Sequence, residues 1–126
     1  MEVQYKAVPK KNPAKQDEAP KYYAQVVSSG EVTLRQLVSR ISAISTLSPA
    51  DTMAAIEALL EVVPQALTEG KLVRLGDFGS FSLQVNSEGV KDVKDLDRKK
   101  IKRITVRFRP GKEFTQVTDA AHLTRI

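Results

Sequence analysis

Cysteine is absent from this chain of 126 residues, and histidine occurs once, as His122. Without thiols the protein forms no disulfide bond and no thiolate metal site, and one histidine with carboxylates would make an unusual metal centre. No serine has a His/Asp partner at a spacing typical of a catalytic triad, and no two carboxylates stand out as an acid–base couple. We therefore expect no metal, no cofactor and no enzyme activity.

Long apolar runs are also missing from the sequence. None approaches the ~20 residues that a membrane-spanning helix needs, and Lys6, Lys10 and Lys11 interrupt the region where a signal peptide would be apolar. Hydrophobic residues make up 41% of the chain, which suffices for a small core in a protein of single-domain length. We expect a cytoplasmic protein.

Basic residues are concentrated in one segment that lacks acidic residues. Residues 98–112 hold eight Lys and Arg and no Asp or Glu, whereas the rest of the chain has 12 basic and 15 acidic residues. Charge runs are usually solvated strand or helix faces, but no acid neutralises this one. Such a concentrated basic segment favours an anionic partner.

The first half of the chain predicts two short strands followed by two helices. Residues 3–8 and 22–27 have strand-like alternation, and the Pro-rich residues 9–20 between them are typical of a loop. Thr33 and Gln36 form a capping box that starts the first helix. Ser48 caps a second helix with Pro49 at its first position, and Gly70 ends it. We expect Pro64 to kink this helix or to end its regular part.

The second half changes to a strand period. Residues 72–85 are strand-like and are broken by Gly76 and Gly79, and a polar, charged stretch follows over residues 86–100. Residues 101–109 alternate between apolar and polar side chains, with Arg103, Arg107 and Arg109 on the polar side. Pro110 and Gly111 predict a turn, and residues 112 to about 123 predict a short final helix.

This order of elements and two local motifs resemble the HU/integration-host-factor family of bacterial histone-like DNA-binding proteins. The first motif is Val73-Arg74-Leu75-Gly76-Asp77-Phe78-Gly79-Ser80-Phe81, and the second is Phe108-Arg109-Pro110-Gly111-Lys112. The resemblance covers about residues 31–120 and is nearest to the divergent Bacteroidetes-type branch with an N-terminal extension. It implies an α+β fold with a helical hairpin, a small antiparallel sheet extended into an arm, a short C-terminal helix and an intertwined dimer. Residues 1–30 would be the extension and residues 31–126 the HU-like domain.

The resemblance also implies a function, which is sequence-tolerant binding, shaping and compaction of double-stranded DNA in the nucleoid. The chain would act as a homodimer, or as one half of a heterodimer, with Phe78, Phe81 and Phe108 in the shared core. The residues expected to contact DNA are Arg103, Arg107, Arg109 and Lys112, supported by Lys99, Lys100 and Lys102 of the arm and by Arg74.

The arm departs from the family pattern, because residues 86–100 contain no proline that would wedge between base pairs. Val90, Val93 and Leu96 either substitute as wedges or pack the arm. Four acidic residues among the lysines of the arm support an alternative function, an HU-like interaction module that has lost strong DNA binding. RNA is a further possible ligand. The three tyrosines at positions 5, 22 and 23 either stack on bases or cover a sheet.

Overall fold

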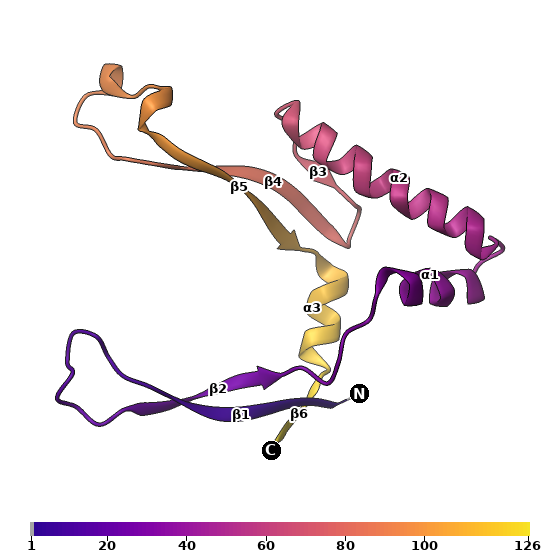
Figure 1. The fold of residues 1–126 in the computed structure, drawn as a ribbon, viewed down its shortest axis with the longest axis horizontal. Helices are drawn as coiled ribbons and strands as arrows, with labels where there is room; N and C mark the ends of the chain where they lie inside the picture. Colours follow the sequence, from indigo (N-terminus) through magenta and orange to yellow (C-terminus); the bar gives the residue numbers. More distant parts are fainter. Residues whose placement is uncertain (1) are drawn as a thin grey trace.

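A computed structural model describes residues 2–126 of the chain. Figure 1 shows two β-projections that extend to the same side of the molecule, with the helical pair α1–α2 on the opposite side and α3 between the two sheets. The α+β class expected from the sequence is confirmed. The elements, in chain order, are β1 (Glu2–Lys10), β2 (Lys21–Val27), α1 (Leu34–Ala43), α2 (Pro49–Thr68), β3 (Val73–Arg74), β4 (Gly79–Ser87), the 3-10 turns η1 (Val93–Asp95) and η2 (Arg98–Lys100), β5 (Ile101–Pro110), α3 (Lys112–Asp119) and β6 (His122–Arg125).

The helical hairpin begins at the two predicted caps. Thr33 Oγ1 accepts a hydrogen bond from the backbone N–H of Gln36 at 3.3 Å, and Gln36 Oε1 accepts one from the Thr33 N–H at 2.9 Å. Ser48 Oγ accepts from the N–H of Asp51 at 3.1 Å. The expectation that Pro64 ends the regular helix is wrong, because α2 continues to Thr68. Pro64 lies close to the C-terminal end of α2, so only about one turn follows the missing N–H donor.

The second sheet has the order β3-β4-β5, and its pairs are antiparallel. A turn over residues 75–78 joins β3 to β4, and Gly76 occupies the left-handed region there with φ of 53°. Gly79 is buried, and a Cβ on it would lie 2.6 Å from the carbonyl oxygen of Arg109. The sequence prediction that the strand-like segment is broken at these two glycines is therefore confirmed.

The arm beyond this sheet ends in two capped turns. Asp92 Oδ1 accepts from the Lys94 N–H at 3.3 Å and Asp97 Oδ1 accepts from the Lys99 N–H at 3.1 Å. Two of the four acidic residues in the arm therefore stabilise its backbone. Where β4 and β5 meet the tip, the register shifts between Asn86 and Ser87, which leaves Lys102 as an additional, bulged residue.

The first sheet joins the two ends of the described chain. The predicted strands β1 and β2 pair as an antiparallel hairpin, and β6 adds to the other edge of β1 in parallel. The expectation of a final helix to about Leu123 is wrong, because α3 ends at Asp119 and residues 122–125 extend along β1. This pairing satisfies backbone groups on an edge of β1 that would otherwise stay open. The expected HU-like segment therefore contributes a strand to the N-terminal sheet.

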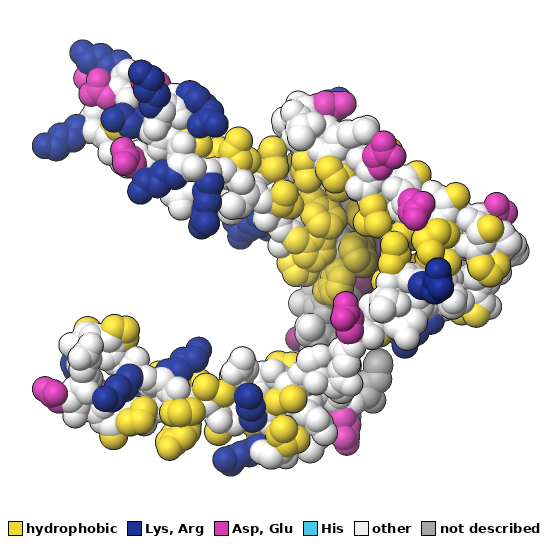
Figure 2. All heavy atoms as spheres, in the orientation of Figure 1, with side chains coloured by type: hydrophobic (Ala, Val, Ile, Leu, Met, Phe, Trp, Pro, Cys, Tyr) yellow, Lys and Arg dark blue, Asp and Glu magenta, His cyan; other side chains and the backbone are white. Residues whose placement is uncertain are grey.

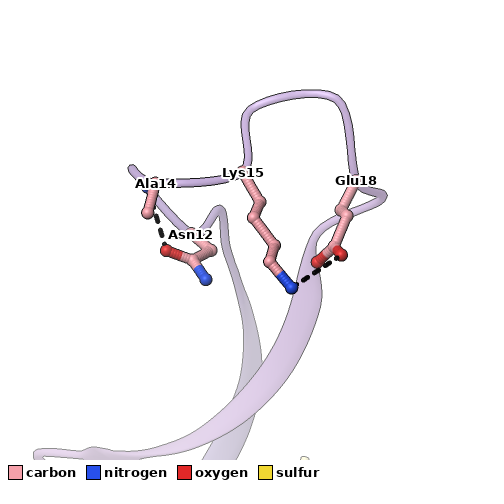
Figure 3. Close-up of polar contacts among 4 residues, drawn as sticks. All are labelled: Asn12, Ala14, Lys15 and Glu18. Atoms are coloured by element: carbon pink, nitrogen blue, oxygen red, sulfur yellow. Dashed lines mark hydrogen bonds and ion pairs between the residues drawn. The ribbon is translucent and has the colours of Figure 1, made fainter.

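The loop between β1 and β2 is held by local polar contacts. Figure 3 shows Asn12 and Ala14 on one side of it, where Asn12 Oδ1 accepts from the Ala14 N–H at 3.0 Å. On the other side, Lys15 Nζ lies 3.6 Å from Glu18 Oε1. The hairpin tip is therefore an ordered turn rather than a simple linker.

Very little of this chain is buried within one copy. Among residues 2–126 the buried hydrophobic side chains are Val38 and Leu67, and Thr52 is the buried polar one. The accessible surface is 10909 Å² for a mass of 13.9 kDa, whereas a compact monomer of this mass exposes about 6,700 Å². Large apolar surfaces of the single chain thus lack a partner.

Candidate nucleic-acid interface

Four arginines lie on one face of the β3-β4-β5 sheet, which we call the arginine face. In the register of the sheet, Ser80 of β4 stands between Arg74 of β3 and Arg109 of β5. Directly paired residues of antiparallel strands project to the same side, so Arg74 and Arg109 flank Ser80. The same rule places Arg107 beside Ser82 and Arg103 beside Asn86.

The arginines of this face form no ion pair within the described residues. Its four arginines, Arg74, Arg103, Arg107 and Arg109, are exposed, and their neighbours on the sheet are Ser80, Ser82, Gln84 and Asn86. Within the part of the chain that the structure describes, the ion pairs are Lys15–Glu18, Lys71–Glu69 and Lys94–Asp92, and none includes these arginines. Free guanidinium groups of this kind bind phosphate through two parallel N–H donors.

One end of the face forms a shallow hollow at the start of α3. Arg74, Arg109 and Lys112 line a cavity of about 360 Å³, together with Asp77 and Gly111. Gly111 approaches the backbone of Asp77 so closely that a Cβ would not fit. The Gly111 N–H donates to the Phe78 carbonyl at 2.9 Å, and the Glu113 N–H to that of Asp77 at 3.2 Å. These bonds hold the start of α3, with Lys112, against the turn that follows β3, whereas the pairing of Arg74 with Ser80 places Arg74 at the same hollow.

The arm lysines are not part of this face. Lys99 and Lys100 lie in η2 near the tip, where Lys99 is exposed and Lys100 is half-buried. Lys102 occupies the bulge between the tip and the sheet. Figure 2 shows Lys and Arg side chains distributed over the whole arm, with Asp and Glu side chains confined to its tip. The structure therefore separates the predicted residues into two groups. The arginine face and the adjoining Lys112 form the first group, and the three arm lysines form a second group nearer the tip.

Apolar side chains occupy the opposite face of the same sheet. The pairs Phe81–Phe108, Leu83–Val106 and Val85–Ile104 follow one another along β4 and β5. The Phe108 ring lies 4.8 Å from that of Phe81 and 5.9 Å from that of Phe78, measured between centroids.

Phe114 of α3 completes this aromatic cluster, with its ring 4.7 Å from that of Phe78. Phe114 was not predicted from the sequence as a core residue. The sequence pattern that could have indicated Phe114 is its three-residue spacing from Val117, which places both side chains on one side of a short helix.

A groove of about 500 Å³ runs between α2 and this apolar face. It is open to solvent, and Phe78 is 42% exposed even inside the aromatic cluster. Figure 2 shows the hydrophobic side chains gathered between the helices and the sheet. The residues along the groove are almost all apolar and include Leu59, Leu60, Val63, Leu67, Phe81, Leu83 and Val106.

Comparison with known families identifies the chain. The family described as "HU domain fused to wHTH, Ig, or Glycine-rich motif" matches residues 1–125. The chain belongs to the HU/integration-host-factor family of histone-like DNA-binding proteins. Integration host factor subunit beta of Idiomarina loihiensis is similar, with 31% identity over 94 residues, which cover 70% of this chain and 97% of the relative.

Two solved structures share the fold of this HU-family chain. A Bacteroides vulgatus protein assigned as DNA-binding aligns with 98% of the chain at a TM-score of 0.69 and 17% identity. The chain spans about half of that protein, 48% of its length. Anabaena HU, solved in a cocrystal with DNA, aligns with 68% of this chain and 95% of its own, at a TM-score of 0.53 and 21% identity. The resemblance drawn from the sequence is confirmed at the level of family and fold.

The arm of this HU-family member has exposed apolar residues where a proline is missing. Val93 is 87% exposed and Leu96 is 52% exposed, whereas Val90 is half-buried. The packing interpretation therefore fits Val90 but not Val93, which lies in η1 at the tip of the arm.

The described residues carry no sign of a metal centre or a membrane segment. Over residues 2–126 no cluster of three or more His, Cys, Asp or Glu side chains is positioned to hold a metal ion. In the same range no helix combines the length and the apolar character needed to cross a membrane.

Proposed function

We propose that this chain binds double-stranded DNA with little sequence preference, as a homodimer, and thereby shapes or compacts DNA in the nucleoid of the cytoplasm. The observation that carries the proposal is the arginine face. It presents four arginines that form no ion pair within residues 2–126 and that stand among neutral polar side chains, and a surface of this kind suits a continuous row of phosphates. The DNA that crystallised with Anabaena HU supports the same ligand class.

Binding through this face depends on phosphates rather than on bases. Arg103, Arg107 and Arg109 would contact the backbone along β5, and Lys112 and Arg74 would extend the contact to the start of α3. Contacts to phosphates position a protein on the duplex without reporting its sequence. Lys99, Lys100 and Lys102 would add contacts from the arm. In this function the binding surface alone would shape the DNA, and no catalytic group is required.

The small core of the single chain supports a second copy of the chain as the partner that fills the groove. The single chain exposes 10909 Å², which exceeds the surface of a compact monomer by about 4,000 Å². Permanent dimers bury roughly 2,000–5,000 Å² in total, or about 1,000–2,500 Å² per chain, so one symmetric interface would account for part of this excess. Two-fold symmetry uses the same patch on both copies, so it would also duplicate the arginine face.

A salt titration with duplex DNA of random sequence tests the function. With 6–10 phosphate contacts per dimer, affinity should fall on the order of 10³–10⁵-fold between 50 and 200 mM salt. Sedimentation equilibrium on the same sample should show a dimer at micromolar concentration. A protein that ignores duplex even at the low salt concentration would overturn DNA binding, and a folded monomer would overturn the dimer.

A second candidate is an HU-like interaction module with weak DNA binding. Two observations favour it, namely the acidic residues near the tip of the arm and the exposed apolar residues of the first sheet, such as Tyr22 and Val26. This alternative predicts a dimer that does not bind duplex in the titration above, so the same experiment separates the two functions.

A further inference from the structure

The N-terminal sheet gathers three lysines on one side, as the second sheet gathers arginines. The register pairs Lys6 with Gln25, Val8 with Tyr23, and Lys10 with Lys21, so these side chains share one side, which we call the lysine face. The other side carries mostly apolar residues, including Val3, Tyr5, Ala7, Pro9, Tyr22, Ala24, Val26 and Leu123.

Two lysines stand directly opposite each other on the lysine face. Lys10 and Lys21 are paired at the loop end of the hairpin, and like charges in that position destabilise a strand pair. Over residues 2–126 no ion pair includes Lys6, Lys10 or Lys21, and all three are exposed. The free protein therefore bears a repulsion that an anion placed between the two ammonium groups would relieve.

The surroundings of these lysines suit such an anion. Lys10, Lys11, Lys21 and Tyr23 line a hollow of about 330 Å³ beside the loop, and Lys10 Nζ lies 5.8 Å from the centre of the Tyr23 ring. The one acid that lines the hollow is Glu18. Its carboxylate already pairs with Lys15 (Figure 3), at 3.6 Å. The hollow thus combines three ammonium groups without a free counter-charge.

We infer that the lysine face is a second DNA-binding surface, which contacts backbone phosphates of double-stranded DNA through Lys6, Lys10 and Lys21. The inference rests on the proposed function. The β1–β2 hairpin and the β4–β5 arm project to the same side of the molecule (Figure 1), and both carry Lys and Arg side chains (Figure 2). A polyanion that approaches from that side meets basic groups on both projections. Exposed lysines act there as point charges, which suits a backbone whose sequence is not read.

The test compares salt dependence of duplex binding for the full chain and two triple variants. Lys6→Ala/Lys10→Ala/Lys21→Ala should lower the salt slope by about 0.9 for each phosphate that the variant no longer neutralises, and weaken binding at low salt on the order of tenfold or more. The charge-preserving variant Lys6→Arg/Lys10→Arg/Lys21→Arg should bind as the wild type does. Lys15→Ala/Glu18→Ala is the matched control, because it removes both members of an ion pair without changing the net charge, and it should leave the slope nearly unchanged.

A single reversal of charge gives a second, independent measurement. Lys10→Glu places opposite charges across the strand pair with Lys21, so it should raise hydrogen-exchange protection in the hairpin of the free protein while it weakens duplex binding. A merely structural role of Lys10 would not produce these opposite effects.

Two failures are distinguishable. If the triple alanine variant keeps the wild-type affinity and slope while substitution of the arginine face abolishes binding, the lysine face is not a DNA surface and the proposed function stands. If the wild type itself does not bind duplex, the proposed function fails and this inference fails with it.

Discussion

The two sheets of this chain follow the same plan, yet only one of them has a second layer on its apolar side. In β3-β4-β5, the aromatic cluster and the groove face α2 and α3. In β2-β1-β6, Tyr22 is 70% exposed, and the strands contact one another with only sparse contacts to the rest of the chain. An amphipathic sheet thus becomes part of a core only when another element supplies the opposite apolar layer.

The basic sides of the two sheets differ in the same way. The second sheet uses arginine, whose planar group binds phosphate in a fixed geometry, and the first uses lysine, a flexible point charge. The arginines of β5 lie on a sheet whose other side faces α2 and α3, whereas the lysines of β1 and β2 lie on a hairpin without a second layer. We therefore expect the arginine face to provide most of the affinity and the lysine face to extend the contact.

The largest expected effect is on the apolar side of the second sheet. Phe81→Ala should cost about 3–5 kcal/mol in the free energy of unfolding, because in the proposed dimer it removes a large side chain from the shared core. It should also shift sedimentation equilibrium toward monomer. Tyr22→Ala, on the apolar side of the first sheet, is the control and should cost less than about 1 kcal/mol. Equal costs would show that the first sheet is covered as well.

The next effect concerns the arginine face. Arg103→Ala/Arg107→Ala/Arg109→Ala should weaken duplex binding on the order of 10³-fold at low salt, and by the same factor on any sequence, because phosphate contacts carry no base information. Thr105→Ala, on the same strand and the same side, should bind as the wild type does. A folded triple variant that binds duplex normally would remove this face from the mechanism.

A smaller effect is expected from deletion of residues 1–30. The segment 31–126 should remain a folded dimer, with a free energy of unfolding changed by less than about 1 kcal/mol, because little of the extension is buried against the remainder. Residues 122–126 should lose protection from hydrogen exchange, since β6 loses its pairing with β1. Unfolding of the truncated chain would show that the two sheets are one cooperative unit.

Local patterns in the sequence predicted most of the elements. The capping box at Thr33, the cap at Ser48 and the alternation over residues 101–109 each depend on neighbours a few residues apart. The structure contains the helices and the strand that these patterns predicted. Such signals survive folding because tertiary contacts reinforce them.

Three features that depend on contacts between distant parts of the chain were not predicted. Residues 122–125 form a strand only because β1 offers an edge more than a hundred residues away in the sequence. The position of Arg74 beside Arg109 depends on three strands in one register. Phe114 is a further case, because its place in the aromatic cluster follows from how α3 packs.

The smallest expected effect separates the charges within the arm. Asp92 and Asp97 accept backbone hydrogen bonds, so their removal would alter the turns as well as the charge. Asp95 is exposed, and over residues 2–126 its carboxylate has no hydrogen bond or ion pair. Asp95→Asn should therefore tighten duplex binding by about twofold at low salt, because it removes the screened repulsion between one carboxylate and the phosphates of the DNA backbone. Glu57→Gln, an equal change of charge on α2, is the control and should have less effect. If both variants tighten binding equally, net charge explains the gain. If neither does, the tip of the arm lies away from the DNA and the face on β5 acts alone.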